Sequence, residues 1–332
     1  MLAPFIVVFG VLLALAPSLI AAQADRTAFA RPMSIPFPAD APYSPQIATL
    51  GKMLYFDPRL SGAQNMSCAS CHNPSFGWET PVETAVGAAN EPLGRHAPTV
   101  INMAWVEPYF WDGRAATLEE QAAGPITADV EMAAKFEDVI RRLGQVDEYS
   151  YWFTKLFPGE GLSREAILTA IATYERTIVS GWAPFDRWVE GNEDAISASA
   201  KRGFDLFVGK MHCADCHTGW NFTDNEFHDI GLATDDIGRA ALEPDNPKAM
   251  YAFKTPGLRN TTLRAPFGHA GQVWDIETLI SHYASGGIKR PSLSTKMRPF
   301  STTPEEIADV VAFLETLTEE TTDVPTPILP AN

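Results

Sequence analysis

A five-residue pattern occurs twice in the chain, as CASCH at residues 68–72 and as CADCH at residues 213–217. The two copies use every cysteine of the chain, namely Cys68, Cys71, Cys213 and Cys216. Two cysteines separated by two residues and followed directly by histidine are the attachment signature of c-type haem. A zinc site or a redox dithiol could use such pairs, but neither requires the histidine in both copies. The pattern therefore predicts two covalently bound haem c groups, with His72 and His217 as proximal iron ligands.

The first 24 residues carry no Asp, Glu, Lys or Arg and end in Ala22-Gln23-Ala24, a small-x-small cleavage signal. This leader resembles a secretory signal peptide, so we expect export to the periplasm with cleavage near Ala24. It lacks the usual basic residue near its start, and its apolar run is almost long enough to span a bilayer as an uncleaved anchor. Membrane attachment is expected only in that second case.

The formal net charge of −16 lies entirely outside the leader, because the leader has no charged side chain. Such a charge argues against nucleic acid as a partner. A basic protein or a neutral small molecule would be repelled least. The same charge is also ordinary for a soluble exported protein, so by itself it names no partner.

Helical patterns dominate the rest of the sequence. Residues 47–55 and 133–144 have apolar side chains at helical spacing. Ser163 can cap a further helix, and residues 303–306 form a capping box that opens a helix through Leu317. Alternating strand patterns are scarce. We therefore expect a mainly α fold of two cytochrome c-like domains, each wrapping one covalent haem, with long ordered loops.

The two haem motifs divide the chain into comparable halves, with a soft boundary among the Gly, Asn, Asp and Ser residues near 182–197. We expect an N-terminal domain over residues 25–190, which would hold the first haem, and a C-terminal domain over residues 191–320, which would hold the second. The Pro-rich tail at residues 321–332 is expected to be extended or disordered.

Four blocks of sequence surround the two motifs in the order DPRLSGAQNMSCASCHNP, APTVIN, FWDGRAATLEEQAAGPITADVEM and FKTPGLRNTTLRAPFGHAGQ. Together these blocks resemble the bacterial dihaem cytochrome c peroxidase superfamily, and within it the MauG-like branch. The likeness covers residues 40–318, and it is specific because several separate blocks keep the family's order.

The resemblance implies roles for four residues of the FWDGR block and the segment after it. Trp111 matches the electron relay between the haems, Gln121 and Glu131 match the distal glutamine and glutamate, and Pro125 matches a proline of the same pocket. A carboxylate beside iron can take a proton from the near oxygen of peroxide and return one to the leaving oxygen, while the glutamine orients the peroxide. Taken alone, Trp111 would be an ordinary aromatic and Glu131 a first-turn helix charge.

A first departure from the peroxidase pattern concerns the first iron. Peroxidases that need reductive activation cap this iron with a histidine, whose matching position here is Ala88. Residues 73–95 contain no His, Met, Cys, Lys or Tyr, so we expect an open sixth position, with His96 as the nearest rival ligand. His96 also stands where the family usually has an Asn that helps bind an inter-domain calcium ion. This puts calcium in doubt, although Arg264 and Pro266 could offer backbone carbonyls.

A second departure concerns the other iron, for which the peroxidases supply a methionine. The matching position here, seventeen residues after Pro266, is Tyr283. MauG-type enzymes have a tyrosine as this axial ligand, and a phenolate stabilises ferric and higher oxidation states. His282 and His269 are the alternative ligands, and Met250 is a further candidate.

The resemblance implies a periplasmic dihaem c-type oxidoreductase that uses hydrogen peroxide to oxidise a partner protein at a Trp side chain, through a high-valent dihaem state. The alternative is a dihaem cytochrome c peroxidase that takes electrons from a small cytochrome c or a cupredoxin. A dihaem electron carrier is a third reading, disfavoured because carriers normally cap both irons. Methylamine dehydrogenase precursor and a copper-binding protein are candidate partners by family analogy alone.

Overall fold

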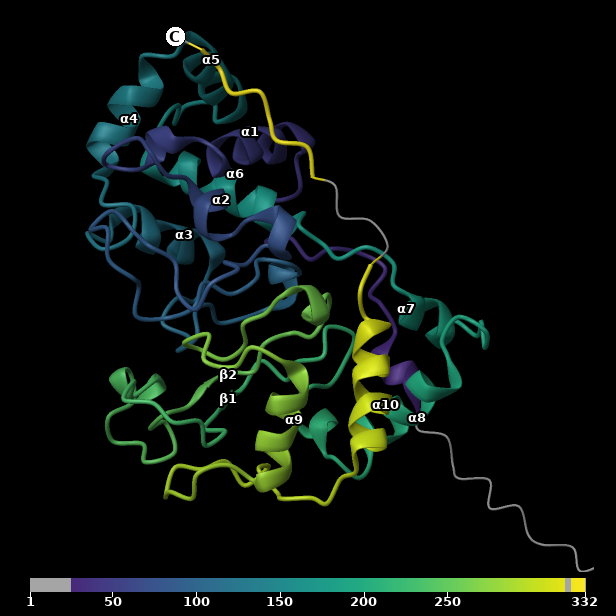
Figure 1. The fold of residues 1–332 in the computed structure, drawn as a ribbon. Coiled ribbons are helices and arrows are strands. Elements are labelled where there is room, and N and C mark those ends of the chain that lie inside the picture. Colours follow the sequence, from purple (N-terminus) through teal and green to yellow (C-terminus); the bar gives the residue numbers. More distant parts are fainter. Residues whose placement is uncertain (1–24, 320–323, 332) are drawn as a thin grey trace, which may run out of the picture.

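The computed structural model describes residues 25–319 and 324–331 (Figure 1). The predicted leader, residues 1–24, lies outside the described residues, as does part of the predicted tail. Within the described ranges no helix is both long enough and apolar enough to cross a membrane.

The described residues form a mainly helical structure, which confirms the predicted fold class. The helices are α1 (Pro45–Tyr55), α2 (Cys68–Cys71), α3 (Leu118–Thr127), α4 (Phe136–Gly144), α5 (Asp147–Leu156), α6 (Arg164–Arg176), α7 (Pro184–Val189), α8 (Ala198–Val208), α9 (Ile276–Ser285) and α10 (Pro304–Glu315). The strands β1 (Phe227–His228) and β2 (Phe253–Lys254) pair antiparallel, with Phe227 opposite Lys254.

A first core lies among α1, α3, α4, α5 and α6. Helix α1 crosses α6 at Gly51, where a Cβ atom would lie only 1.8 Å from the carbonyl oxygen of Ala170. Only glycine lets the two backbones approach this closely. Buried side chains such as Leu54 and Ile167 then fill the space on either side of the crossing.

A second core lies among α7, α8 and α10 and consists largely of aromatic rings. Helix α8 crosses α10 at Gly203, where a Cβ atom would lie 1.9 Å from the carbonyl oxygen of Asp309. Beside this crossing, the rings of Phe204 and Phe313 pack edge to face with centroids 5.5 Å apart. This edge-to-face arrangement is a preferred geometry for aromatic pairs.

The two ends of the described chain each pack on the half that lies further away in sequence (Figure 1). Phe29, near the start, is buried in the second core, where it stacks on Phe222. Phe185 and Trp188 also belong to that core, so the packing of these three side chains does not follow the predicted boundary at residue 190. At the other end Leu329 is extended and packs against the first core.

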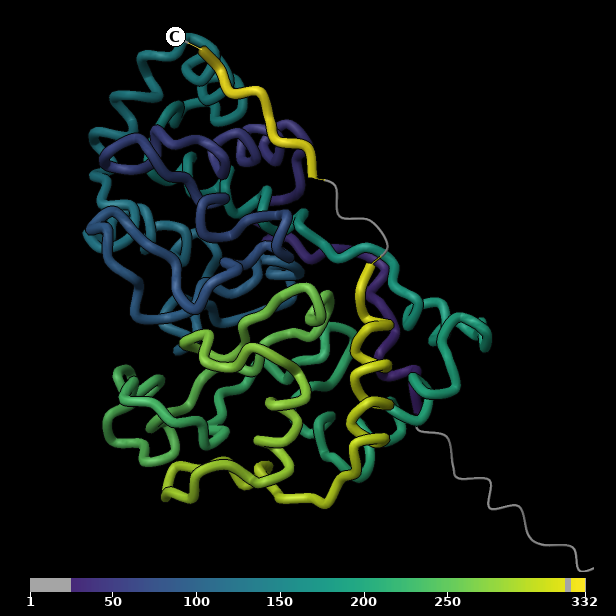
Figure 2. Tube along the Cα trace, viewed as in Figure 1, coloured from purple at the N-terminus to yellow at the C-terminus, as the bar shows by residue number. Residues whose placement is uncertain are grey.

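Long loops connect these helices, as the tube in Figure 2 shows for the segment between α2 and α3. This segment is ordered by isolated β-bridges, which pair Asn73 with Glu79 and Tyr109 with Ala115. The loops border two cavities, and most of the residues that separate these cavities come from loops rather than helices.

Candidate haem sites

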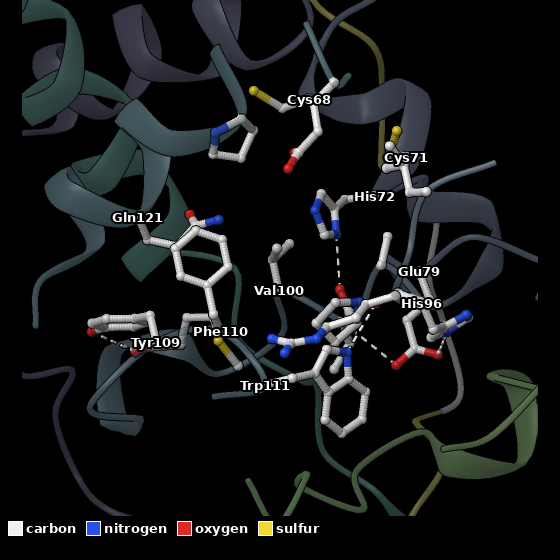
Figure 3. A pocket seen from close by; sticks show the side chains of 18 of the residues that line it. Cys68, Cys71, His72, Glu79, His96, Val100, Tyr109, Phe110, Trp111 and Gln121 are labelled. Carbon is white, nitrogen blue, oxygen red and sulfur yellow. Dashed lines mark hydrogen bonds and ion pairs between the residues drawn. The ribbon is translucent and has the colours of Figure 1, made fainter. Parts of the chain in front are cut away.

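The first haem motif borders a cavity of 490 Å³, and Figure 3 shows Cys68, Cys71 and His72 on one side of it. The imidazole Nδ1 of His72 lies 2.8 Å from the carbonyl oxygen of Pro98, which fixes the ring and leaves Nε2 as the metal-binding nitrogen. Burial lowers the pKa of His72, so the neutral imidazole that binds iron is favoured. These residues fit a c-type haem.

Three of the four motif cysteines have a raised pKa, which disfavours the reactive thiolate. Burial raises the pKa of Cys68 and Cys71, and it raises the pKa of Cys213 to about 12. A redox dithiol needs at least one thiol with a lowered pKa. The cysteine chemistry therefore fits covalent attachment to haem better than disulfide exchange.

Three of the residues expected at the peroxide pocket are brought together along the first cavity. Gln121 and Pro125 lie one turn apart on α3, and Glu131 follows four residues after the helix ends. Burial raises the pKa of Glu131, and the nearby guanidinium of Arg114 opposes this shift. The arrangement places a carboxyl group and an amide at one cavity wall.

Trp111 lies in the wall shared by both cavities, as its expected position between the haems requires. Its indole Nε1 donates a hydrogen bond of 2.9 Å to the carbonyl oxygen of His96 (Figure 3). Its own carbonyl oxygen accepts a hydrogen bond of 2.8 Å from the backbone N–H of Lys254. Two hydrogen bonds thus hold the tryptophan in place.

The second haem motif borders a cavity of 190 Å³ together with Tyr283 of α9. The Nδ1 of His217 lies 3.0 Å from the carbonyl oxygen of Phe222, so this ring too keeps Nε2 for a metal. Burial lowers the pKa of His217 and raises the pKa of Tyr283 well above its usual range. A phenolate at Tyr283 therefore requires a cation at its oxygen, as ligation to iron would provide.

The alternative ligands to Tyr283 are placed differently. The Nε2 of His282 lies 2.8 Å from the carbonyl oxygen of Ile230, and neither His282 nor Met250 is among the described residues that line the cavity. His269 does line it, but its Nε2 lies 3.0 Å from the hydroxyl of Thr234.

The loop after the first motif lies directly against Glu131. The N–H of Ala88 donates a hydrogen bond of 2.7 Å to the carbonyl oxygen of Glu131. The rival ligand His96 is buried, with Nδ1 2.9 Å from the carbonyl oxygen of Glu83 and Nε2 3.5 Å from a carboxylate oxygen of Glu79. Each ring nitrogen of His96 therefore already faces an oxygen atom.

Several residues that line these cavities were not predicted as site residues, including some whose side chains can bind a proton or a metal. Glu79 borders both cavities, Met297 borders the second, and Glu175 of α6 borders the first. Burial raises the pKa of Glu175 to about 8. Glu175 could have been found as an acidic residue next to Tyr174 in a helix whose other face is apolar. Glu79 and Met297 lie in loops, where the sequence shows no periodic pattern that would single them out.

Comparison with known proteins places the chain in a family. Residues 45–194 match the di-haem cytochrome c peroxidase family and residues 200–318 match the cytochrome c family. The chain is 49% identical over 91% of its length to the methylamine utilization protein MauG of Methylorubrum extorquens, covering 86% of that protein. The chain belongs to the di-haem cytochrome c peroxidase family. The predicted resemblance, including its MauG-like branch, is confirmed.

Two further relatives show the breadth of the di-haem cytochrome c peroxidase family. Cytochrome c551 peroxidase of Pseudomonas aeruginosa is 35% identical over 88% of this chain and 84% of its own length. The solved structure of a MauG-like protein associated with microbial copper homeostasis superposes with a TM-score of 0.81 at 28% identity, covering 87% of this chain and 95% of that one. As a family member, this protein is a peroxide-dependent dihaem oxidoreductase with two haem c groups.

Proposed function

We propose that this protein acts in the periplasm, where it uses hydrogen peroxide to oxidise a Trp side chain of a partner protein. The observation that carries the proposal is the position of Trp111 in the wall common to both cavities, with Glu131 bordering one cavity and Tyr283 the other. Such a wall gives an oxidising equivalent a route between the two sites and lets the partner stay outside the peroxide pocket.

The proposed haem sites use the two motifs directly. Cys68 and Cys71 would form the thioether links of one haem, and His72 would bind its iron. The second haem would use the other motif, through Cys213, Cys216 and His217. When bound, the two haems supply the iron that reduces peroxide and the orbitals that store two oxidising equivalents.

Glu131 is the proposed acid and base of the peroxide reaction. Its carboxylate would take the proton from the peroxide oxygen nearer the iron and deliver it to the leaving oxygen, which departs as water. The raised pKa supports this role, because a group that both accepts and returns a proton works best when its pKa approaches the working pH. Gln121 would orient the peroxide through its amide, and Pro125 would shape the same wall.

Tyr283 is the proposed axial ligand of the second iron. Its burial, together with its place on the cavity that His217 borders, supports this assignment. A phenolate favours the oxidised forms of iron, so this site would hold an oxidising equivalent rather than deliver electrons.

The partner is proposed from the relatives. The 49% identical relative takes part in methylamine utilization by its name, which supports a partner protein from that system, such as a methylamine dehydrogenase precursor. The 35% identical cytochrome c551 peroxidase supports the second candidate function, in which a small cytochrome c or cupredoxin donates electrons.

The deciding experiment compares the two kinds of partner. The purified dihaem protein receives hydrogen peroxide together with either a methylamine dehydrogenase precursor or a reduced small cytochrome c. We expect mass spectrometry to show oxidised Trp in the precursor, with little cytochrome oxidised. Rapid oxidation of cytochrome c with no change in the precursor would replace our proposal by the peroxidase function.

The proposed location has its own measurement. The mature protein from a periplasmic extract is expected to begin near Asp25, as N-terminal sequencing would show. Recovery of the intact leader in the membrane fraction would instead indicate an anchored protein.

A further inference from the structure

Glu79 and Arg264 stand 185 positions apart in sequence and meet inside the wall between the two cavities. The guanidinium Nη1 of Arg264 donates a hydrogen bond of 2.6 Å to a carboxylate oxygen of Glu79. The side chain of Arg264 is 5% exposed and that of Glu79 is 7% exposed. Glu79 borders both cavities and Arg264 borders the second. A buried ion pair therefore joins the two halves of the chain at the point where the haem sites adjoin.

Each partner of this ion pair is held by further hydrogen bonds. The same oxygen of Glu79 accepts a hydrogen bond of 2.9 Å from the N–H of Thr99, and its other oxygen faces His96. The second guanidinium nitrogen of Arg264 donates a hydrogen bond of 2.7 Å to the carbonyl oxygen of Gly257. These bonds pair both buried charges, and an unpaired buried charge would cost several kcal/mol. The Nε of Arg264 has no hydrogen-bond partner among the described residues.

The ion pair is connected to Trp111 through His96. A carboxylate oxygen of Glu79 faces the Nε2 of His96, and the carbonyl oxygen of Glu83 faces its Nδ1. The backbone carbonyl oxygen of His96 in turn accepts the hydrogen bond from the indole of Trp111. The stem of Arg264 is also fixed, since a Cβ at Gly77 would lie 2.5 Å from its Cγ. The order of contacts is thus Arg264, Glu79, His96 and Trp111.

The side chains of this wall do not supply the oxygen ligands that the calcium ion implied by the family resemblance would need. Calcium takes six to eight oxygen ligands. Here the carboxylate of Glu79 already accepts from a guanidinium and a backbone amide, and His96 presents nitrogens that both face oxygens. Among the described residues, the group of His, Cys, Asp and Glu side chains spaced to hold a metal is Cys216, Asp224 and His228, which does not include Glu79 or His96.

We propose that the guanidinium of Arg264 is the resident cation of this wall, standing in for calcium and positioning Trp111 through Glu79 and His96. The inference goes beyond the proposed function, because it concerns how the two haem sites are joined and holds whichever partner is oxidised. Arg264 is a positioning residue, because its guanidinium donates to Glu79 and to the carbonyl oxygen of Gly257.

The first test uses the wild-type dihaem protein. Calcium is measured by mass spectrometry after passage over a chelating resin, and absorption spectra and the rate of reaction with peroxide are recorded with EGTA and then with added CaCl₂. We expect less than one-tenth of a calcium ion per protein and no change in spectra or rate. One tightly held calcium ion per protein, or a loss with EGTA that calcium reverses, would overturn the proposal.

The second test uses Arg264→Met and Arg264→Lys, with Arg259→Met as the matched control. Arg259 forms a buried ion pair of 2.8 Å with Asp186, with side chains 1% exposed, and is not among the described residues that line either cavity. Loss of either pair destabilises the fold, so stability alone cannot distinguish them.

The distinguishing readout is redistribution of oxidising equivalents between the two haems after peroxide, followed by stopped-flow absorbance without any partner protein. We expect Arg264→Met to slow this redistribution at least tenfold and to make its rate depend on added calcium. Arg264→Lys should recover most of the rate, and Arg259→Met should have the wild-type rate. An Arg264→Met protein with the wild-type rate would refute the inference. If Arg264→Met does not fold, the rate of Arg264→Lys and the calcium content of the wild-type protein still test the inference. Neither measurement depends on the partner protein proposed above.

Discussion

The indole Nε1 of Trp111 donates a hydrogen bond of 2.9 Å to the backbone carbonyl of His96, whose imidazole is itself held from both sides. A backbone acceptor cannot rotate away as a side-chain acceptor can, so the indole has one orientation in the wall between the cavities. A fixed orientation favours an electron relay, because the distance from the ring to each haem site then stays constant.

Trp111→Phe removes the indole while keeping an aromatic ring of similar shape. We expect both haems and peroxide binding to persist, while oxidation of the partner falls by at least about tenfold. Mass spectrometry of the partner after a fixed time with peroxide measures the loss. Trp182→Phe is the control, since Trp182 is 48% exposed and should oxidise the partner at the wild-type rate. Equal rates for both variants would exclude Trp111 as the relay.

Glu131→Gln keeps the size of the side chain but removes its ability to exchange a proton. We expect the reaction with peroxide to slow by about 10²–10⁴-fold, the usual contribution of general acid–base catalysis. Stopped-flow absorbance at the haem bands follows the reaction. The control is Glu137→Gln, at an exposed position on α4.

The pH dependence of the same reaction follows from burial of Glu131. Its raised pKa means that the carboxylate, the form that accepts the first proton, is lost at a higher pH than for an exposed glutamate. We expect the wild-type rate to fall as the pH drops through this raised pKa, and this acid limb to be absent in Glu131→Gln. A limb that persists in the variant would assign the titration to another group.

Tyr283→Phe removes the phenol oxygen proposed to bind the second iron. We expect the absorption and electron paramagnetic resonance signals of that haem alone to change. His282→Asn is the neighbouring control and should leave both haems as they were. Met297→Leu tests a methionine that lines the same cavity, and a changed second haem in that variant, with none in Tyr283→Phe, would make Met297 the ligand.

Glu175→Gln tests a buried acid with a pKa raised to about 8. The folded protein binds this proton more tightly than the unfolded chain, whose glutamate has the ordinary value of 4.5. The contribution of Glu175 to stability is therefore fully present below pH 4.5 and is lost as the pH rises towards 8. We expect the variant to be less sensitive to pH in this window and to unfold several degrees higher than wild type at pH 8.

Thermal unfolding at pH 6 and pH 8 measures the effect of Glu175→Gln. Glu165→Gln is the control on the same helix, because its side chain is 67% exposed and should show no such gain. A wild-type stability that does not vary between the two pH values would indicate that Glu175 has another proton or cation partner in the haem-loaded protein.

Local patterns predicted α1, α4, α6 and α10, because capping and periodicity act over a few residues. Ser163 caps α6 through a hydrogen bond of 2.9 Å to the N–H of Ala166, and Thr303 forms the expected capping box at α10. That helix ends at Glu315, two residues earlier than predicted, where Thr316 turns the chain. Such differences are usual at helix ends, which fray.

The residues of the candidate sites were accessible from sequence where a family block carries them together, as it does Trp111, Gln121 and Glu131. The Glu79–Arg264 pair was not, because its partners are 185 positions apart and each is an ordinary charged residue by itself. Phe29 gave no sign of joining the second core, since only the folded arrangement brings it beside Phe222.

The exchange of chain ends has a consequence for dissecting the molecule. A fragment that stops at residue 190 would leave the first core uncovered where Leu329 packs, and a fragment that starts at residue 191 would lack Phe29, Phe185 and Trp188. We therefore expect neither half to fold fully without the other. We also expect proteolytic trimming at one terminus to loosen the half that is more distant along the chain, because the trimmed residues pack there.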